Sequence, residues 1–246
     1  AARAGISTQF AWGTLNIILF KAFYESSPEN FPMGFSAFVS YIWMQQAFLA
    51  FFAMWTFESD ITDSIVSGSI AYQMSKPINI YNLWFTRSVA LRLARGLLRC
   101  FPVLIIASIL PQPYRLMMPD PITFFIFLFS MSLGLCTAAA FTCLIYVLCF
   151  FTVSPKGLQI VFFSASEMLM GQIIPIPFFP ETIKKILEFS PFTGIQNIPL
   201  RIFSYDISSV DAGKKILLQV FWLLVLFLLG KIIAKAAEKK LVVQGG

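Results

Sequence analysis

The chain has 246 residues and a net charge of +6, and 58% of its residues are hydrophobic while only 12% are charged. A soluble domain carries about 25% charged residues, so this composition excludes an ordinary soluble protein and predicts an integral membrane protein. The absence of histidine also excludes histidine-based proton relays, metal sites and catalytic triads.

We expect residues 1–246 to form one all-α membrane domain with six transmembrane helices. About 20 apolar residues are needed to cross the hydrocarbon core of a bilayer. The stretches that approach or exceed this length are 6–24, 35–57, 97–112, 122–151, 158–175 and 214–236. The third of these carries Arg99 and Pro102 in its first turns. The fourth would be about 45 Å long as a helix, so it must tilt, kink or project into water.

Basic residues near the ends of the spans indicate the orientation, because cytoplasmic loops carry an excess of Lys and Arg. If both termini are cytoplasmic, eleven of the 18 Lys and Arg residues lie inside and seven lie outside. We therefore expect a multi-pass protein of the plasma or inner membrane with both termini cytoplasmic. Two segments outside the spans are long enough to have a role of their own, the cytoplasmic 58–96 and the external 176–213.

Polar residues within the expected spans mark a candidate translocation path. They lie near the midpoints of the first, second and fifth spans or follow the fifth midpoint closely: Asn16, Gln45, Gln46, Glu167 and Gln172. Ionisable groups inside a membrane are costly and usually face a cavity or a partner. For the amides the alternative is hydrogen bonding between helices. For Glu167 the alternatives are an ion pair with Lys21 and protonation by desolvation.

The cytoplasmic segment begins with a short acidic helix, expected over residues 58–67. Glu58, Asp60 and Asp63 stand where negative charge suits the positive end of the helix dipole, and we expect Gly68 to end the helix. A brief helix held between two spans is suited to docking a soluble partner.

A second cytoplasmic helix is expected after Pro77. Arg92, Arg95 and Arg99 lie on one of its faces. We interpret these arginines as residues that extend toward the membrane interface and help to set the orientation.

The external segment is rich in proline. Pro175 lacks a backbone donor and is expected to end the fifth helix, and Pro177 and Pro180 keep the following chain extended. The stretch ETIKKILEF, residues 181–189, has the amphipathic pattern of a short interfacial helix. One interpretation of the segment is a loop that only lies on the membrane, without a gate.

Three stretches, taken in order, carry a family resemblance: SGSIAYQMSKPINIYNLWF (67–85), GQIIPIPFFP (171–180) and SPFTGIQNIP (190–199). The chain resembles the permease subunits of type-2 ABC exporters over nearly its whole length. The most similar branch is a bacterial group with a Gly…Tyr…Lys-Pro-hydrophobic-Asn pattern after the second span. The positions of that pattern here are Gly68, Tyr72, Lys76, Pro77, Ile78 and Asn79.

The resemblance implies roles for the two segments outside the spans. The short helix would be the coupling helix that docks into an ATPase, with contacts from Glu58, Asp60, Ile61, Asp63, Ile65, Gly68 and Tyr72. The external segment would be a re-entrant pair of short helices before the last span. Its gate residues would be Pro175, Pro177, Phe178, Phe179 and Pro180.

The resemblance also implies the partners. These are a cytosolic ABC ATPase dimer, which binds ATP and Mg, a second permease subunit and the lipid bilayer, without nucleic acid. The chain itself has no GxxxxGK[ST] motif, since AGKKI at 212–216 lacks the upstream glycine and the hydroxyl. We therefore expect a non-catalytic chain without a cofactor or metal of its own, which exports an amphipathic peptide, drug or lipid-like molecule.

Two other functions remain open at this point. An integral membrane enzyme acting on lipids would need polar groups gathered at one interface, and only Glu58, Asp60 and Asp63 come close. A channel or structural membrane subunit would need no ATPase.

Overall fold

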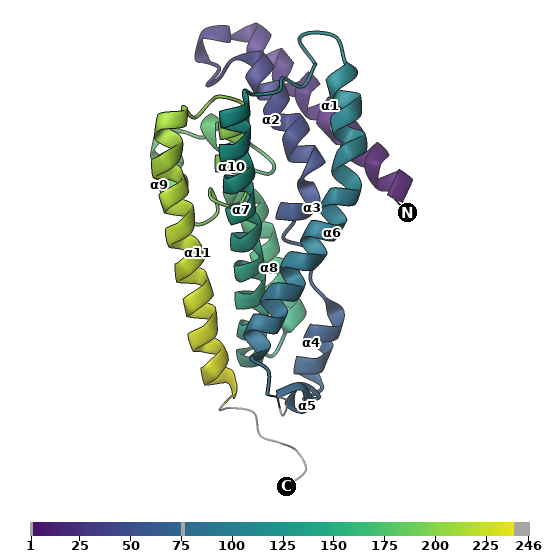
Figure 1. The fold of residues 1–246 in the computed structure, drawn as a ribbon, viewed down its shortest axis with the longest axis vertical. Coiled ribbons are helices and arrows are strands. Elements are labelled where there is room, and N and C mark those ends of the chain that lie inside the picture. The colour runs from purple at the N-terminus through teal and green to yellow at the C-terminus, as the bar shows by residue number, and fades with distance from the viewer. Residues whose placement is uncertain (1, 75–76, 239–246) are drawn as a thin grey trace.

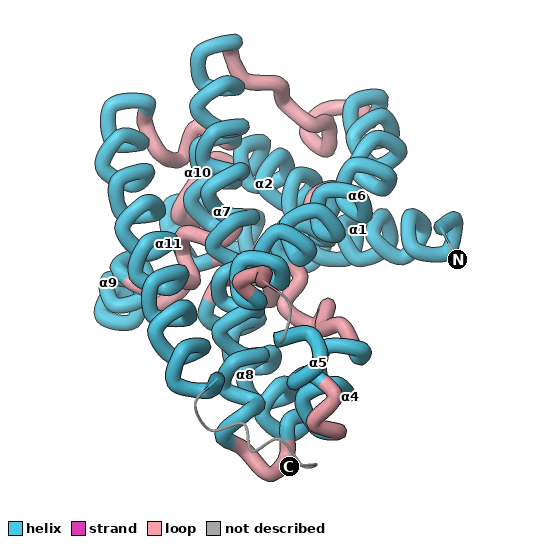
Figure 2. Tube along the Cα trace, turned by 60° about the horizontal axis from the view of Figure 1, so that its bottom comes forward, coloured by secondary structure: helices cyan, strands magenta, loops and turns pink. Residues whose placement is uncertain are grey.

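The computed structural model describes residues 2–74 and 77–238, and within them it contains helices and no strand. The predicted all-α class is therefore confirmed. The long helices α6, α7 and α11 run along the long axis of the molecule, and α4 and α5 lie together at one end of it (Figure 1). Figure 2 shows α1 projecting away from the remaining helices toward the N-terminus.

The elements follow one another with short connections. Their bounds are α1 Ala2–Ser26, η1 Pro28–Asn30, α2 Phe35–Ala47, α3 Leu49–Phe52, α4 Ser59–Val66, α5 Ile70–Met74, α6 Ile80–Ile109, α7 Pro121–Leu148, η2 Cys149–Phe151, α8 Pro155–Leu169, η3 Ile176–Phe178, α9 Glu181–Phe189, α10 Asn197–Phe203 and α11 Ser209–Glu238.

Helix α7 forms the centre of the bundle. Asp120 caps its N-terminus by accepting a hydrogen bond from the Thr123 backbone N–H at 3.0 Å, and Pro121 occupies the first turn, where its missing N–H costs nothing. In the described residues, two helices are long and apolar enough to cross a membrane, Pro121–Phe151 and Val210–Glu238. In the most apolar part of the first helix 78% of the residues are buried in the protein, whereas in the second helix only 17% are. Helix α7 is therefore the core helix, and α11 packs on its outside.

Several predicted helix boundaries were wrong. The second expected span is split at Phe48 into α2 and α3 and ends at Phe52, not at residue 57. The helix that contains the third expected span begins at Ile80 rather than at residue 97, because Asn79 caps it through a bond from the Asn82 N–H. The arginines that follow do not interrupt it.

The fifth long helix also ends earlier than predicted. Helix α8 stops at Leu169, before Pro175, and Gly171 has a φ of 78°. A residue in this left-handed region ends a helix readily when it is glycine, which has no Cβ to clash. The turn at Gly171, and not Pro175, therefore ends α8.

The chain between α9 and α10 turns back toward the middle of α7. A Cβ on Gly134, near the midpoint of α7, would lie 2.2 Å from the Ile195 carbonyl oxygen, so only glycine allows this approach. Gln219 of α11 donates to the Gly194 carbonyl at 2.7 Å and to the Ser130 carbonyl at 3.1 Å. The turn is thus held between α7 and α11, and α10 leads the chain away from it.

Candidate functional site

Helix α4 is the short helix expected over residues 58–67, and its bounds agree with that prediction. Asp60 lies in its first turn, and Gly68, with a φ of 74°, follows the C-cap residue Ser67. Ile61 is buried at 4% exposure and packs into the cluster formed by the ends of α6, α7 and α11. The apolar side of α4 is therefore attached to the bundle (Figure 1).

Arg87 of α6 holds the N-terminus of α4. Its Nε lies 2.6 Å from the Glu58 carboxylate and its Nη2 lies 2.6 Å from Asp60 Oδ2. The bond from Arg87 lowers the pKa of Asp60. Partial burial raises the pKa of Glu58, although Arg87 acts in the opposite direction. Of the two carboxylates, Glu58 therefore loses its charge first when the pH falls.

Two other helices also bind α4. The Glu58 backbone N–H donates to the Tyr146 hydroxyl of α7 at 2.6 Å, and Gln159 Nε2 of α8 donates to Thr62 Oγ1 at 2.8 Å. Figure 2 shows α4 beside α8 at this end of the molecule. Side chains of α6, α7 and α8 thus converge on one short helix. In this arrangement a displacement of α4 is transmitted to all three of these helices.

The opposite face of α4 is open. Asp63 is exposed, Val66 is 66% exposed, and Tyr72 of α5 is 74% exposed. Of the expected partner contacts, Ile61 is turned into the protein and the Glu58 side chain is only 9% exposed. Among the motif residues, Lys76 lies outside the described residues.

Arg92 does not extend toward a membrane interface as expected, but is buried at 3% exposure. Its guanidinium donates to the carbonyls of Phe51 and Ala53 at 3.0 and 2.7 Å and to Thr142 Oγ1 at 2.8 Å. The prediction was wrong because the helix begins at Ile80, which places Arg92 between α3 and α7.

The structure brings together part of the expected path. Gln45 Nε2 donates to the carbonyls of Gly171 and Gln172 at 3.2 and 3.3 Å, so α2 holds the turn that ends α8. Gln46 is buried on the same helix. Asn16 lies apart from them and donates within its own helix, to the Trp12 carbonyl at 3.0 Å.

A cavity of about 680 Å³ opens beside Asn16. Its walls come from α1, the η1 region and the segment after α8, and it is lined mainly by aromatic and aliphatic side chains with amides and hydroxyls between them: Asn16, Leu19, Phe20, Phe23, Ser26, Ser27, Asn30, Phe31, Pro32, Ile173, Ile174 and Phe178. None of these lining residues is charged. The cavity can therefore accept an apolar or aromatic group together with a few neutral hydrogen-bonding atoms.

The expected ion pair between Lys21 and Glu167 is not formed. Lys21 instead binds Glu25 one turn further along α1, with Nζ 3.4 Å from the carboxylate. Glu167 Oε1 is buried and has no hydrogen-bond partner in the described part of the chain. Lys21 therefore does not neutralise Glu167.

The expected gate residues lie along η3 and its flanks. Phe178 packs against Phe20, Phe31 and Phe38, with ring centroids 4.8, 4.9 and 5.6 Å apart. Pro175 and Pro177 are buried, Phe179 is half-buried, and Pro180 is exposed at the start of α9. The segment is thus packed onto α1 and α2 next to the cavity.

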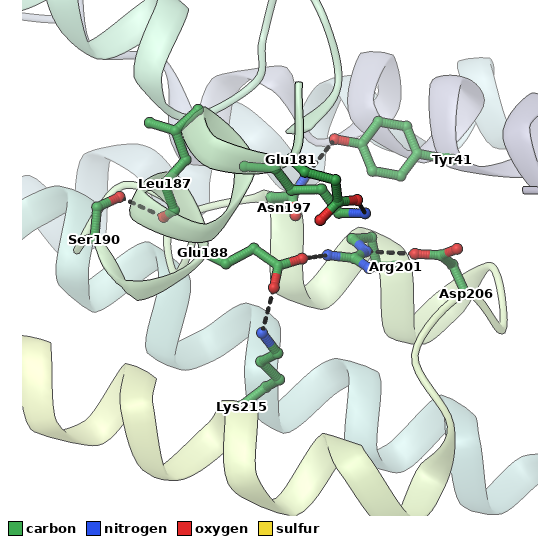
Figure 3. A network of polar contacts seen from close by, with 10 residues as sticks. Tyr41, Glu181, Leu187, Glu188, Ser190, Asn197, Arg201, Asp206 and Lys215 are labelled. Atoms are coloured by element: carbon green, nitrogen blue, oxygen red, sulfur yellow. Dashed lines mark hydrogen bonds and ion pairs between the residues drawn. The ribbon is translucent and has the colours of Figure 1, made fainter. Parts of the chain in front are cut away.

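A network of charged residues was missed by the sequence analysis. Glu188 of α9 binds Arg201 Nη1 of α10 at 2.8 Å and Lys215 Nζ of α11 at 3.2 Å, and Arg201 Nε also binds Asp206 (Figure 3). Helix α9 therefore turns Glu188 toward the protein. Its apolar residue Ile186 is 67% exposed, so α9 presents an apolar surface outward.

A family model described as ABC-2 family transporter protein matches residues 10–245. The chain belongs to the ABC-2 transporter family. This confirms the resemblance to an ABC-2 type permease, and it makes the chain a membrane component of a transporter that works with an ATPase partner and is not itself catalytic. Searches of curated proteins and of solved structures gave no match.

Proposed function

We propose that this ABC-2 family chain is the transmembrane permease subunit of an ATP-driven exporter, with α4 as its coupling helix. It would cross the plasma or inner membrane six times with both termini cytoplasmic. Two such subunits, identical or paralogous, would associate with a dimer of cytosolic ATPases that bind ATP and Mg. The exported molecule would be amphipathic, such as a peptide, a drug or a lipid-like compound.

One observation carries this proposal, the way in which α4 is built into the molecule. Its inner face is fixed to three long helices through Arg87, Tyr146 and Gln159. Its outer face exposes Asp63 and Val66. A helix that is anchored on one side and open on the other is suited to receive a soluble partner and to pass on its movement.

The cavity beside Asn16 supports the proposed class of substrate. Its lining combines aromatic faces with neutral polar groups and contains no charged side chain. A molecule with an apolar body and a few hydrogen-bonding atoms would fit this lining, whereas a compact multiply charged ion would lose its hydration without compensation.

The enzyme alternative is weakened by the contacts of the acidic cluster. Glu58 and Asp60 both bind Arg87, which leaves Asp63 as the one carboxylate of the three that forms no ion pair among the described residues. Paired carboxylates of this kind serve to hold α4 in place and are poorly disposed for acid–base chemistry on a lipid.

The docking face can be tested by capture of the ATPase from native membranes in mild detergent. The Asp63→Arg variant changes the charge by two units at the exposed face, and Glu29→Arg makes the same change on η1 at the opposite end of the molecule. We expect the parent and Glu29→Arg to retain a nucleotide-binding ATPase and Asp63→Arg to lose most of it. Capture of no ATPase by the parent in several detergents would contradict the proposal and favour a channel or an enzyme.

A further inference from the structure

The buried guanidinium of Arg92 has no counter-ion among the described residues. It is 3% exposed, and none of the ion pairs in the described part of the chain includes it. A charge buried without an opposite charge is costly, and an apolar side chain of similar volume is often as stabilising or more so. The charge of Arg92 therefore calls for a role beyond stability.

Arg92 donates to Ser88 Oγ within its own helix at 3.4 Å, and its remaining partners belong to two other elements. On one side it binds the carbonyls of Phe51 and Ala53 at the C-terminus of α3, where the last carbonyls of a helix have no donor within the helix. On the other side it binds Thr142 of α7. Gly96, one turn further along α6, lets Phe51 pack directly on the α6 backbone, since a Cβ there would lie 1.8 Å from the Phe51 ring. Arg92 thus joins α3 to both α6 and α7.

The connection from α3 to α4 is fixed at both of its ends by the same two helices. At Phe51 and Ala53 the bonds come from Arg92, which is itself bound to Thr142. At Glu58 they come from Arg87 of α6 and Tyr146 of α7. Thr142 and Tyr146 lie one turn apart on α7, so one face of that helix supports the whole connection.

We infer that Arg92 is a positioning residue that makes α4, α6 and α7 move as one rigid body. This inference rests on the proposed function, because it concerns how movement of the coupling helix reaches the membrane helices. When a partner displaces α4, the external ends of α6 and α7 then move with it, and the α3–α4 connection, residues 53–58, does not change its conformation.

The test uses two variants of Thr142 that differ in one hydroxyl. Thr142→Val removes the partner of Arg92 Nη2 at nearly unchanged shape, and Thr142→Ser keeps the hydroxyl. Spin labels are placed at Ser59→Cys on α4 and Met118→Cys in the external α6–α7 loop, and both sites are exposed. The four native free cysteines are replaced, and labelled chains are diluted with unlabelled ones so that the labels report one intramolecular distance. The distance is measured in the purified permease–ATPase complex, without nucleotide and after trapping with ATP and vanadate.

We expect one narrow distance distribution, unchanged by trapping, in the parent and in Thr142→Ser. In Thr142→Val we expect it to broaden and to shift on trapping. Arg92→Lys, whose single ammonium cannot reach the α3 carbonyls and Thr142 together, should behave in the same way and serves as the second variant if Thr142→Val fails to fold.

Two results would overturn the inference. One is a distance that shifts on trapping in the parent itself. The other is a distribution in both Thr142→Val and Arg92→Lys identical to that of the parent, even if their melting temperatures fall, since a merely structural contact would lower stability alone. If no ATPase co-purifies, the proposed function fails instead, and the width of the distribution in the permease alone still decides the inference.

Discussion

Replacement of Glu188 by glutamine should destabilise the packing of α9, α10 and α11. Glu188 accepts hydrogen bonds from Arg201 and Lys215, and the three side chains are 25%, 12% and 26% exposed. Glutamine keeps the shape and one acceptor oxygen but removes the charge. Arg201 still has Asp206 as a partner, whereas Lys215 loses the one carboxylate that it binds among the described residues.

The magnitude follows from these contacts. A hydrogen bond to a charged group contributes roughly 1.5–3 kcal/mol, and the partial exposure of Glu188 and Lys215 reduces this. We expect the free energy of unfolding to fall by about 2 kcal/mol for Glu188→Gln. In a chain of this size that corresponds to a melting temperature lower by about 4–8 °C. The assay is the loss of the monodisperse gel-filtration peak after heating the purified protein in detergent.

The matched control is Glu181→Gln on the same helix. Glu181 pairs with Lys184 at i, i+3 but is 73% exposed, so its loss should change stability by less than about 0.5 kcal/mol. If Glu188→Gln lowers the melting temperature no more than Glu181→Gln does, the network does not hold the three helices together and the reasoning is refuted.

Three further predictions concern other contacts. Arg87→Gln should release the N-terminus of α4 and reduce capture of the ATPase several-fold while the protein still folds, as measured by pull-down and gel filtration; unchanged capture would contradict the anchoring role. Gly134→Ala should force the Ile195 turn away from α7 at a cost of about 1–3 kcal/mol or more, seen as a lower melting temperature, and an unchanged one would mean that the turn adapts freely. The Tyr205 hydroxyl, with Thr123, lowers the pKa of Asp120 to about 2, so the stability that Asp120 contributes is fully present above the ordinary pKa of an aspartate and is lost as the pH falls from that value toward 2. In Tyr205→Phe the pKa of Asp120 should lie nearer its ordinary value, so the contribution should be smaller and its loss should be complete at a higher pH; identical acid melting curves would contradict this.

The fold class could be predicted from the sequence because it depends on composition and length. Long apolar stretches and few charged residues exclude most other fold classes. Short motifs such as the acidic cluster before Gly68 predict each end of α4 to within one residue. Helix ends were predicted less accurately where two residues that can end a helix follow one another closely. Pro175 was expected to end α8, but Gly171 ends it first.

The charged contacts could not be predicted because they join distant parts of the chain. Arg87 meets Glu58 and Asp60 only after α6 folds back beside α4. Arg92 shares a face with two other arginines in the sequence, yet the helix buries it against α3 and α7. A continuous helical pattern from Ile80 onward was the available indication that Arg92 lies inside the bundle.

The residues of the expected translocation path and the charged network around α9 also depend on contacts between distant parts of the chain. Gln45 was singled out as a polar residue in an apolar stretch, and its partners are backbone carbonyls after α8, which a sequence does not reveal. Residues 181–189 were expected to form an amphipathic interfacial helix, and the structure turns the charged side chain of Glu188 inward toward its partners. An amphipathic pattern gives two faces and does not say which one meets the protein.

The most direct test of the coupling role is photocrosslinking from α4 in native membranes. A benzophenone amino acid is placed at Val66 on α4 and, in a separate variant, at Ile186 on α9, because these two side chains are 66% and 67% exposed. The account predicts that Val66 crosslinks to a nucleotide-binding ATPase, identified by mass spectrometry, and that Ile186 does not. If Val66 yields no ATPase, or if Ile186 yields it equally, α4 is not the site at which an ATPase drives this protein.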